Sequence, residues 1–181
     1  MFHFVYVDCQ NLSTEGKAVK AVEDGLATNI SVAMNSKILQ PSYEIDFGNL
    51  IEFIPDSDDE DIYGCTLFGS RPPSSDTIWN KAEKANYDVV IADRNVPNSD
   101  GLSGTGITVA MFRDARSRGY DAPDVFNFVS GEADLAPIIW RLVDKGSFVR
   151  LVYWDHVDEA LIDACSDFVS LNQYINRFSR E

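Results

Sequence analysis

The chain alternates between short apolar runs and longer stretches in which apolar side chains recur every three or four positions. The runs are rich in β-branched and aromatic residues, which is typical of buried strands. They predict strands over residues 4–8, 62–68, 87–93, 124–130 and 148–153. The helical spacing predicts helices over residues 46–54, 78–85, 107–118 and 135–145, and mainly helix after residue 153.

Strands that alternate with helices over short connections favour one parallel sheet with helices on both faces. We therefore predict an α/β fold, a three-layer α/β/α sandwich. Residues 14–40 are only mildly helical and contain several breakers, so no element is assigned there. Ligands of such folds bind beyond the carboxyl ends of the strands. The acids expected at those ends are Asp8, Asp93 and the two in the Ser-Gly-Glu-Ala-Asp segment over residues 130–134.

The charge balance limits the kinds of partner that the chain can bind. Its 181 residues carry 15 basic and 29 acidic side chains, a formal net charge of −14. This charge argues against a nucleic-acid interaction driven by a broad basic surface. It is compatible with nucleic acid held locally by a few arginines and a metal ion.

Composition and cysteine spacing suggest a protein of the cytoplasm. Hydrophobic residues make up 45% of the chain, enough for a buried core, yet no apolar run approaches the roughly 20 residues of a membrane helix. The N-terminus lacks the basic and apolar regions of a signal peptide. Cys9, Cys65 and Cys165 show no metal or disulfide spacing, so we expect reduced thiols with no disulfide partner.

Four segments, in order, carry a recognisable pattern. Residues 5–12 read Val-Tyr-Val-Asp-Cys-Gln-Asn-Leu, and residues 68–73 read Phe-Gly-Ser-Arg-Pro-Pro. Residues 129–137 read Val-Ser-Gly-Glu-Ala-Asp-Leu-Ala-Pro, and residues 146–171 end in Asp-Phe-Val-Ser-Leu. Together they resemble the NYN domain and its LabA-like relatives, a branch of the PIN-like nuclease fold with Rossmann-like topology. The resemblance implies a single domain over residues 1–181, with an inserted or variable segment at about residues 15–43.

The resemblance also implies a metal-dependent ribonuclease that hydrolyses RNA phosphodiesters with Mg²⁺ or Mn²⁺. Asp8 matches the first metal-binding acid of the family, and Asn11 matches the Asn that supports the site. Glu132 stands where the family usually has Asp, and Asp134 matches the second acid of that motif, so both are expected to bind metal. Ser130 matches a Ser that orders a ligand. RNA is the implied partner, and a homodimer is plausible because such domains often pair.

One departure from the family pattern weakens the expectation of catalysis. The acid usual at the start of the helix after the third strand is replaced by Gly104 or Thr108, depending on the alignment. Asp100 and Asp114 are tentative substitutes for it. The second hypothesis is therefore a catalytically degenerate NYN domain that binds RNA, a nucleotide or a protein.

Ordinary structural roles compete with each of these assignments. Asp8 and Asn11 could end a strand and form a turn, and Glu132 and Asp134 could favour a helix dipole. Arg71 and Arg94 are the candidate phosphate contacts, although single cations on an acidic protein are weak evidence. Residues 88–102 also resemble the phosphoacceptor loop of a response-regulator receiver, with Asp93 modified, but the second acid and the lysine of receivers are missing. The acidic run over residues 56–61 is expected to be a solvated loop.

Overall fold

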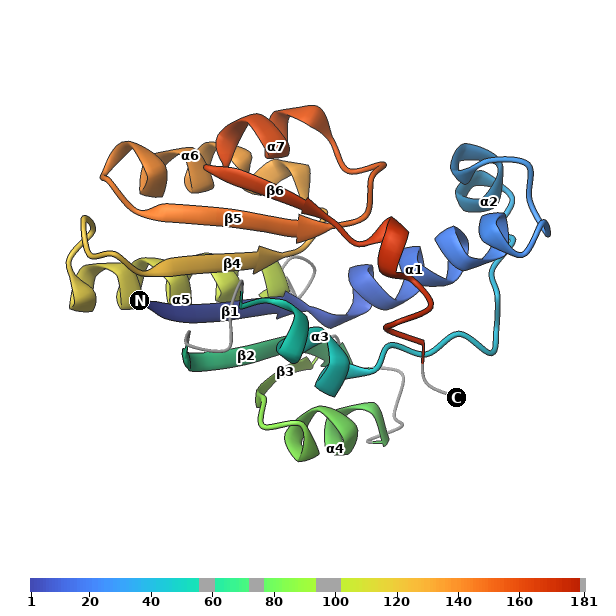
Figure 1. Cartoon of the computed structure of the whole chain (residues 1–181), viewed down its shortest axis with the longest axis horizontal. Helices are drawn as coiled ribbons and strands as arrows, with labels where there is room; N and C mark the ends of the chain where they lie inside the picture. Colours follow the sequence, from blue (N-terminus) through green and yellow to red (C-terminus); the bar gives the residue numbers. More distant parts are fainter. Residues whose placement is uncertain (56–60, 72–76, 94–101, 180–181) are drawn as a thin grey trace.

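One parallel sheet forms the centre of the protein (Figure 1). The computed structural model of the chain describes residues 1–55, 61–71, 77–93 and 102–179. Within these residues six strands pair in the order β3-β2-β1-β4-β5-β6, every pair parallel. The strands are β1 Phe2–Asp8, β2 Asp61–Arg71, β3 Asp88–Asp93, β4 Val125–Val129, β5 Phe148–Tyr153 and β6 Asp167–Ser170.

Helices cover both faces of this sheet. Figure 1 shows α5 behind the strands and α3 in front of them. The predicted α/β three-layer sandwich is therefore confirmed. The helices are α1 Cys9–Glu23, α2 Ile30–Asn35, α3 Phe47–Phe53, α4 Thr77–Lys84, α5 Leu102–Arg118, α6 Ala136–Asp144 and α7 Glu159–Ala164, with two 3₁₀ turns, η1 Ala133–Leu135 and η2 Asn172–Tyr174.

The first predicted strand occupies a central position. In β1 every residue from His3 to Asp8 is buried, because β2 and β4 flank it and helices cover its faces. Such burial on both faces explains why the segment reads as a continuous aromatic and β-branched run rather than an alternating one. The parallel register aligns Val7 with Val129 of β4, so the two strands end side by side.

One helix boundary and one strand differ from the sequence-based predictions. Helix α5 begins at Leu102, five residues before the predicted start, because Gly104 and Gly106 lie within the helix and hide its periodicity. The expectation of mainly helix after residue 153 is wrong for β6, a half-buried edge strand that pairs with β5. Four residues at a sheet edge are too few to show a strand period.

Residues 14–40 contain the outer part of α1 and the short helix α2. Asp8 caps α1 and Asn29 caps α2, each accepting a backbone N–H three residues on. A small second core joins the two helices through Ala18, Ala27 and Ala33. Its alanines give little hydrophobic periodicity, which explains why no helix could be assigned. The single domain with a variable segment at residues 15–43 stays a prediction.

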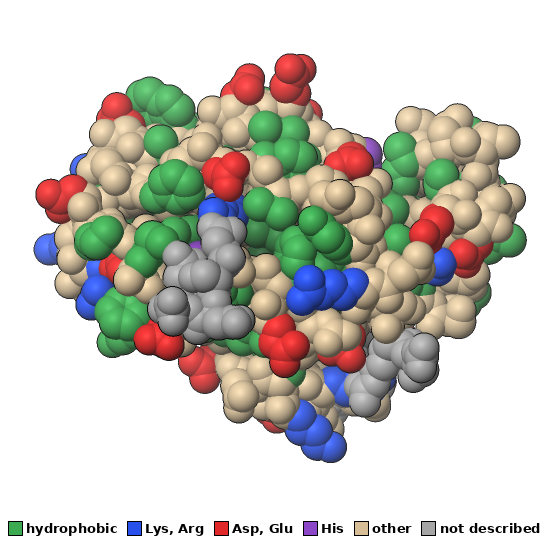
Figure 2. Space-filling view, viewed as in Figure 1, with side chains coloured by type: hydrophobic (Ala, Val, Ile, Leu, Met, Phe, Trp, Pro, Cys, Tyr) green, Lys and Arg blue, Asp and Glu red, His purple; other side chains and the backbone are tan. Residues whose placement is uncertain are grey.

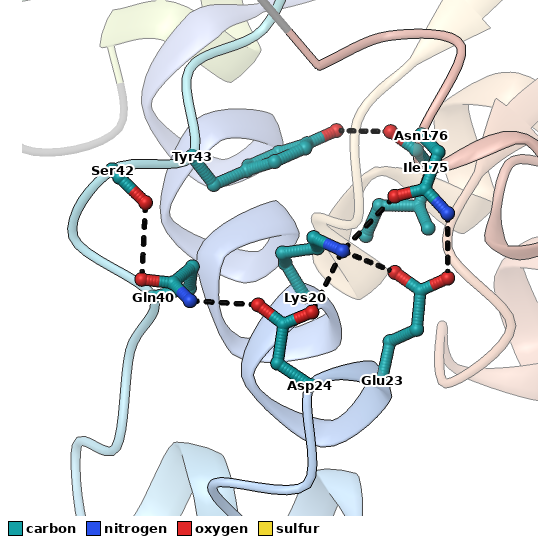
Figure 3. A network of polar contacts seen from close by, with 8 residues as sticks. All are labelled: Lys20, Glu23, Asp24, Gln40, Ser42, Tyr43, Ile175 and Asn176. Carbon is teal, nitrogen blue, oxygen red and sulfur yellow. Dashed lines mark hydrogen bonds and ion pairs between the residues drawn. The ribbon is translucent and has the colours of Figure 1, made fainter. Parts of the chain in front are cut away.

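A polar network fastens the outer end of α1 to distant parts of the chain (Figure 3). Lys20 Nζ lies 2.8 Å from carboxylate oxygens of both Glu23 and Asp24, and 2.9 Å from Oδ1 of Asn176. The same carboxylates accept hydrogen bonds of 2.8 Å from Asn176 Nδ2 and 2.7 Å from Gln40 Nε2. The network thus joins α1, the segment before α3 and the residues after β6.

The segment after β6 is also held by hydrogen bonds to its backbone carbonyls. Tyr43 donates its hydroxyl to the carbonyl of Ile175 at 3.4 Å, and the Asp46 N–H donates to the carbonyl of Phe178 at 2.8 Å. Phe178 is fully buried. Residues 172–179 therefore form a strap across α1 and the start of α3.

Alanine at Gly16 is expected to destabilise the fold. A Cβ at this buried position would lie 2.8 Å from Trp154 Cζ2 and 3.0 Å from Tyr43 Cε1, and both rings are buried. We expect overpacking of about 1–3 kcal/mol to exceed the helix-propensity gain of up to about 1 kcal/mol. Urea unfolding would show this loss, whereas Thr14→Ala, at an exposed position of the same helix, should change stability little. Equal midpoints for the two variants would contradict the expectation.

The remaining sequence-based expectations on cysteines and membranes have clear outcomes. Cys9, Cys65 and Cys165 are all free thiols, as predicted, and burial raises the pKa of Cys9 to about 12. Among the residues described, no helix is both long and apolar enough to span a bilayer. The cellular compartment and the homodimer stay predictions.

Candidate metal and substrate site

Asp8 and Ser130 meet where two neighbouring strands end. Asp8 is the last residue of β1, and Ser130 follows β4 directly. Both side chains are buried, and Ser130 Oγ donates to Asp8 Oδ2 at 3.4 Å. The parallel pairing of β1 with β4 thus brings together two candidate residues separated by 122 positions.

Asn11 holds the Asp8 carboxylate in place. Its backbone N–H donates to Asp8 Oδ1 at 3.3 Å, and its Nδ2 donates to Asp8 Oδ2 at 2.9 Å. Asp8 therefore caps α1, so the structural role and the candidate functional role coexist in one residue. Burial raises the pKa of the Asp8 carboxyl above its ordinary value, and these hydrogen bonds only partly oppose that effect. A cation beside the carboxylate would offset this cost.

Glu132 lies next to this pair. Its backbone N–H donates to Ser130 Oγ at 3.3 Å, and its side chain is half-buried. Burial raises the pKa of Glu132, and the negative charges of Asp8 and Asp134 raise it further. The Glu132 carboxylate is thus repelled by two other carboxylates at the same sheet edge.

Gly104 provides the space in which the Glu132 carboxylate lies. A Cβ on Gly104 would stand 2.0 Å from Glu132 Oε2 and 3.1 Å from its Cδ. The longer acid of the Ser-Gly-Glu motif therefore extends to the first turn of α5. Gly104 is one of the two positions, with Thr108, at which the family resemblance calls for an acid, and Glu132 reaches it.

Asp134 is near the site but is exposed to solvent. It lies in η1, and its charge raises the pKa of Glu132. Among the described residues, no three His, Cys, Asp or Glu side chains are arranged to hold a metal ion. The acids therefore gather without forming a closed set of three ligands.

Of the other predicted residues, Asp114 is not brought to this site. Asp114 accepts a 2.9 Å hydrogen bond from the Tyr6 hydroxyl and pairs with Arg113. It lies ten residues along α5 from Gly104, about 15 Å at the rise of a helix, so it does not supply the missing acid. The backbone of Arg71 ends β2, one strand away from Asp8. Arg94 and Asp100, and the acidic run up to residue 60, lie outside the described residues.

Three residues at this sheet edge were not among the sequence-based candidates. They are Glu15, Tyr153 and His156. Glu15 follows Asn11 by four positions, a spacing that places both on one side of a helix, and this was the available signal. Nothing in the sequence links His156 to Glu15, because 141 residues separate them.

One face of the molecule agrees with the acidic composition. On the face seen in Figure 2, lysine and arginine side chains occur singly among aspartates and glutamates. That face offers no continuous basic area that would attract nucleic acid without local contacts.

Comparisons with known proteins identify the type of domain. The family model of the NYN domain matches residues 4–172, nearly the whole chain. Among solved structures, a protein of unknown function from Vibrio parahaemolyticus shares the fold with a TM-score of 0.67. The two sequences are 14% identical, and the match covers 99% of this chain and 96% of the other. At this identity the likeness concerns the fold alone, and the curated proteins give no match.

Proposed function

The chain belongs to the NYN domain family, and from this premise we propose that it is a divalent-metal-dependent ribonuclease. The observation that carries the proposal is the meeting of Asp8, Ser130 and Glu132 at the carboxyl ends of β1 and β4. Open parallel sheets bind their ligands at this edge. Buried carboxylates that repel one another are also costly unless they serve a ligand.

The donor atoms fit Mg²⁺ or Mn²⁺. Both are hard cations that prefer carboxylate and hydroxyl oxygens, and Mg²⁺ keeps several of its waters. Asp8 and Glu132 would hold the cation directly. Asp134, which is exposed, would hold one of its waters. Because water fills the remaining positions, a closed set of three protein ligands is not required.

The chain's own residues orient the reaction in this proposal. A bound cation supplies Lewis acidity and lowers the pKa of water. Asn11 and Ser130 fix the Asp8 carboxylate by hydrogen bonds at 2.9 Å and 3.4 Å. Arg71 is the last residue of β2 and Arg94 follows β3 in the sequence, and we propose them as contacts to the RNA phosphates.

A binding module without catalysis is the second candidate. It is favoured by the lack of a three-acid cluster among the described residues and by the use of Asp8 as a helix cap. Such a domain would recognise RNA, a nucleotide or a protein at the same sheet edge.

Titration of Mn²⁺ into metal-free protein separates these candidates. We expect saturable binding to the wild type and affinity about 10- to 100-fold weaker in Asp134→Asn, as for other groups that hold metal-bound water. Asp144→Asn, at an exposed position at the end of α6, is the matched control and should bind like the wild type. RNA panels would then be tested for metal-dependent cleavage. Wild-type protein that binds no Mn²⁺ at millimolar concentration would exclude the ribonuclease.

A further inference from the structure

A groove lined by lysines lies between α1 and α4. Its inner part is a pocket of about 260 Å³ between α1, the segment before α3 and the start of α4. An adjoining pocket of about 500 Å³ shares four lining residues with it and continues along α4. Figure 1 shows the segment before α3 running between α1 and α4. We name the two pockets the lysine groove, after Lys17, Lys81 and Lys84, which line them.

The lysine groove is a cationic place on a strongly acidic protein. Within the described part of the chain, three of the 15 basic side chains line it, although the whole chain carries a formal charge of −14. The two acids that line it in this part of the chain already have partners. Glu44 forms an ion pair with Lys81, and Asp46 accepts the Asn49 N–H at 3.0 Å as the cap of α3. The groove therefore offers a local contact through which an acidic protein can hold an anion.

Lys17 lines the groove without a counter-charge among the described residues. It is half-buried on α1, and no described residue forms an ion pair or a side-chain hydrogen bond with it. Lys20, one turn further along the same helix, contacts both Glu23 and Asp24. A partly buried ammonium group is stabilised by an anion beside it, because water no longer solvates the group fully. The position of Lys17 therefore favours an anionic ligand in the groove.

The floor of the inner pocket is apolar and fixed by packing. Tyr43, Ile45 and Phe47 line it, and all three are buried. The Tyr43 hydroxyl donates to the carbonyl of Ile175, so its ring is held in place. Pockets for small organic ligands combine an apolar surface of this kind with a few polar groups that fix orientation. The lysine groove thus suits a ligand with a flat apolar part and a phosphate, as in a nucleotide.

The groove lies at the same edge of the sheet as the strand-end acids. Ser70, next to the end of β2, donates its hydroxyl to Gln10 Oε1 at 3.1 Å, so β2 ends against the first turn of α1. Asp8 caps the same helix, and Lys17 is nine residues further on, about 13 Å by the helix rise. At the rise of about 3.4 Å per nucleotide of a stacked strand, about four nucleotides span this distance. An RNA bound at Asp8 would therefore reach the groove.

We propose that the lysine groove binds single-stranded RNA beside the cleaved bond, with Lys17 and Lys81 contacting phosphates and the apolar floor contacting a base. This inference rests on the proposed function, which supplies the RNA, and names the surface that holds it. Cationic grooves that follow the backbone and present a surface to the bases are the usual way to bind a single strand without sequence readout. Lys81 would exchange Glu44 for a phosphate, and Lys84 extends the groove along α4.

An acidic peptide is the main competing occupant, because lysines also bind carboxylates. RNA is favoured by the position of the groove, next to the sheet edge at which we propose that a phosphodiester is cut. It is also favoured by the apolar floor, to which aspartate and glutamate side chains would add few contacts. The test therefore includes both ligands.

Fluorescence anisotropy of a labelled single-stranded RNA of about 12 nucleotides would measure the affinity, with a chelator present so that no metal binds and no cleavage occurs. We expect Lys17→Met and Lys81→Met each to weaken binding about fivefold. The slope of log affinity against log salt concentration should fall by about 0.7 for each lysine removed. Methionine keeps most of the aliphatic stem, so both variants should fold, which thermal unfolding would verify.

Lys145→Met is the matched control, because it removes the same charge elsewhere. Lys145 is exposed at the end of α6, just before β5, and thus lies at the opposite edge of the sheet. The control should hardly change the affinity or the salt slope. Equal affinities in Lys17→Met, Lys81→Met and Lys145→Met would overturn the proposal.

Glu44→Gln tests the groove in the opposite direction. It removes a negative charge and releases Lys81 from its partner, so RNA should bind about threefold more tightly. Glu83→Gln, at an exposed position of α4 outside the groove, removes the same charge and should leave the affinity nearly unchanged. RNA binding no tighter in Glu44→Gln than in Glu83→Gln would remove Lys81 from the site.

Three further outcomes separate this inference from the alternatives. A poly-aspartate peptide of the same length that binds as tightly as RNA, with the same dependence on Lys17, would overturn the assignment to RNA. RNA binding that needs Lys17, in protein that binds no Mn²⁺, would support the inference and exclude the ribonuclease. Mn²⁺-dependent RNA cleavage with the same KM in Lys17→Met and the wild type would overturn the inference and leave the ribonuclease standing.

Discussion

Asp8→Asn is expected to abolish Mn²⁺ binding and leave the metal-free protein folded and at least as stable as the wild type. Asparagine caps helices as well as aspartate does, so the bond from the Asn11 N–H survives. The Asn11 amide can turn to present its oxygen to the new side chain. The substitution also removes a charge that burial disfavours.

The sign of the pH dependence of folding stability follows from the burial of the Asp8 carboxyl. The folded-state pKa of Asp8 lies above its ordinary value of 3.8. Folded protein therefore holds its proton more tightly than unfolded protein. The contribution of Asp8 to stability is fully present below the unfolded pKa and is lost as pH rises through the folded pKa. Glu132, whose pKa is also raised, behaves in the same way.

Urea unfolding of metal-free protein at about pH 7 and about pH 5 would measure this effect. The wild type should gain stability relative to Asp8→Asn on acidification. RNA cleavage by the variant should fall by at least about 100-fold, since the cation contributes several kcal/mol to phosphoryl chemistry. Undiminished cleavage by Asp8→Asn would remove Asp8 from the mechanism.

Gly104→Ala is expected to weaken Mn²⁺ binding without weakening the fold. The new Cβ would overlap the Glu132 carboxylate, which would have to leave its present position. Because the carboxylate is the far end of a flexible side chain, the move costs little stability. Alanine within α5 also gains up to about 1 kcal/mol of helix propensity over glycine. We therefore expect a metal affinity about tenfold lower, measured by calorimetry, with an unchanged or higher unfolding midpoint.

Two further variants make this prediction specific. Thr105→Ala, at the exposed neighbouring position of α5, should leave the affinity unchanged. Adding Glu132→Asp to Gly104→Ala shortens the acid and should restore part of the binding. Wild-type affinity in Gly104→Ala would mean that the Glu132 carboxylate is not a ligand.

The sequence predicted most of the fold because the central strands are apolar on both faces. The segment from Phe4 to Asp8 could hardly be anything except a buried strand. The predicted helices over residues 107–118 and 135–145 end next to Gly119 and Gly146, and both glycines have positive φ. Strand β6 was missed because it has only four residues and forms by pairing with β5 rather than through a strand pattern of its own. Helix α1 was missed because its outer half packs through alanines, which give little hydrophobic periodicity.

Only those residues of the candidate site that lie in short motifs at the ends of strands could be predicted from the sequence. Asp8 and Ser130 were found because each follows a recognisable apolar run and the parallel topology brings the strand ends together. Glu15 and His156 could not be paired, since their contact depends on how β5 docks on α1. The fit of Glu132 over Gly104 likewise depends on the approach of α5 to the loop after β4.

The strap over residues 172–179 has a consequence for the order in which the chain folds. Its contacts to Lys20, Tyr43 and Asp46 close loops of well over one hundred residues. Contacts so distant in sequence form late, because loop-closure entropy must be overcome first. The outer end of α1 therefore cannot settle until residues 172–179 have been synthesised. Nascent chains that stop before residue 172 would retain an exposed apolar side on α1, where chaperones and proteases act.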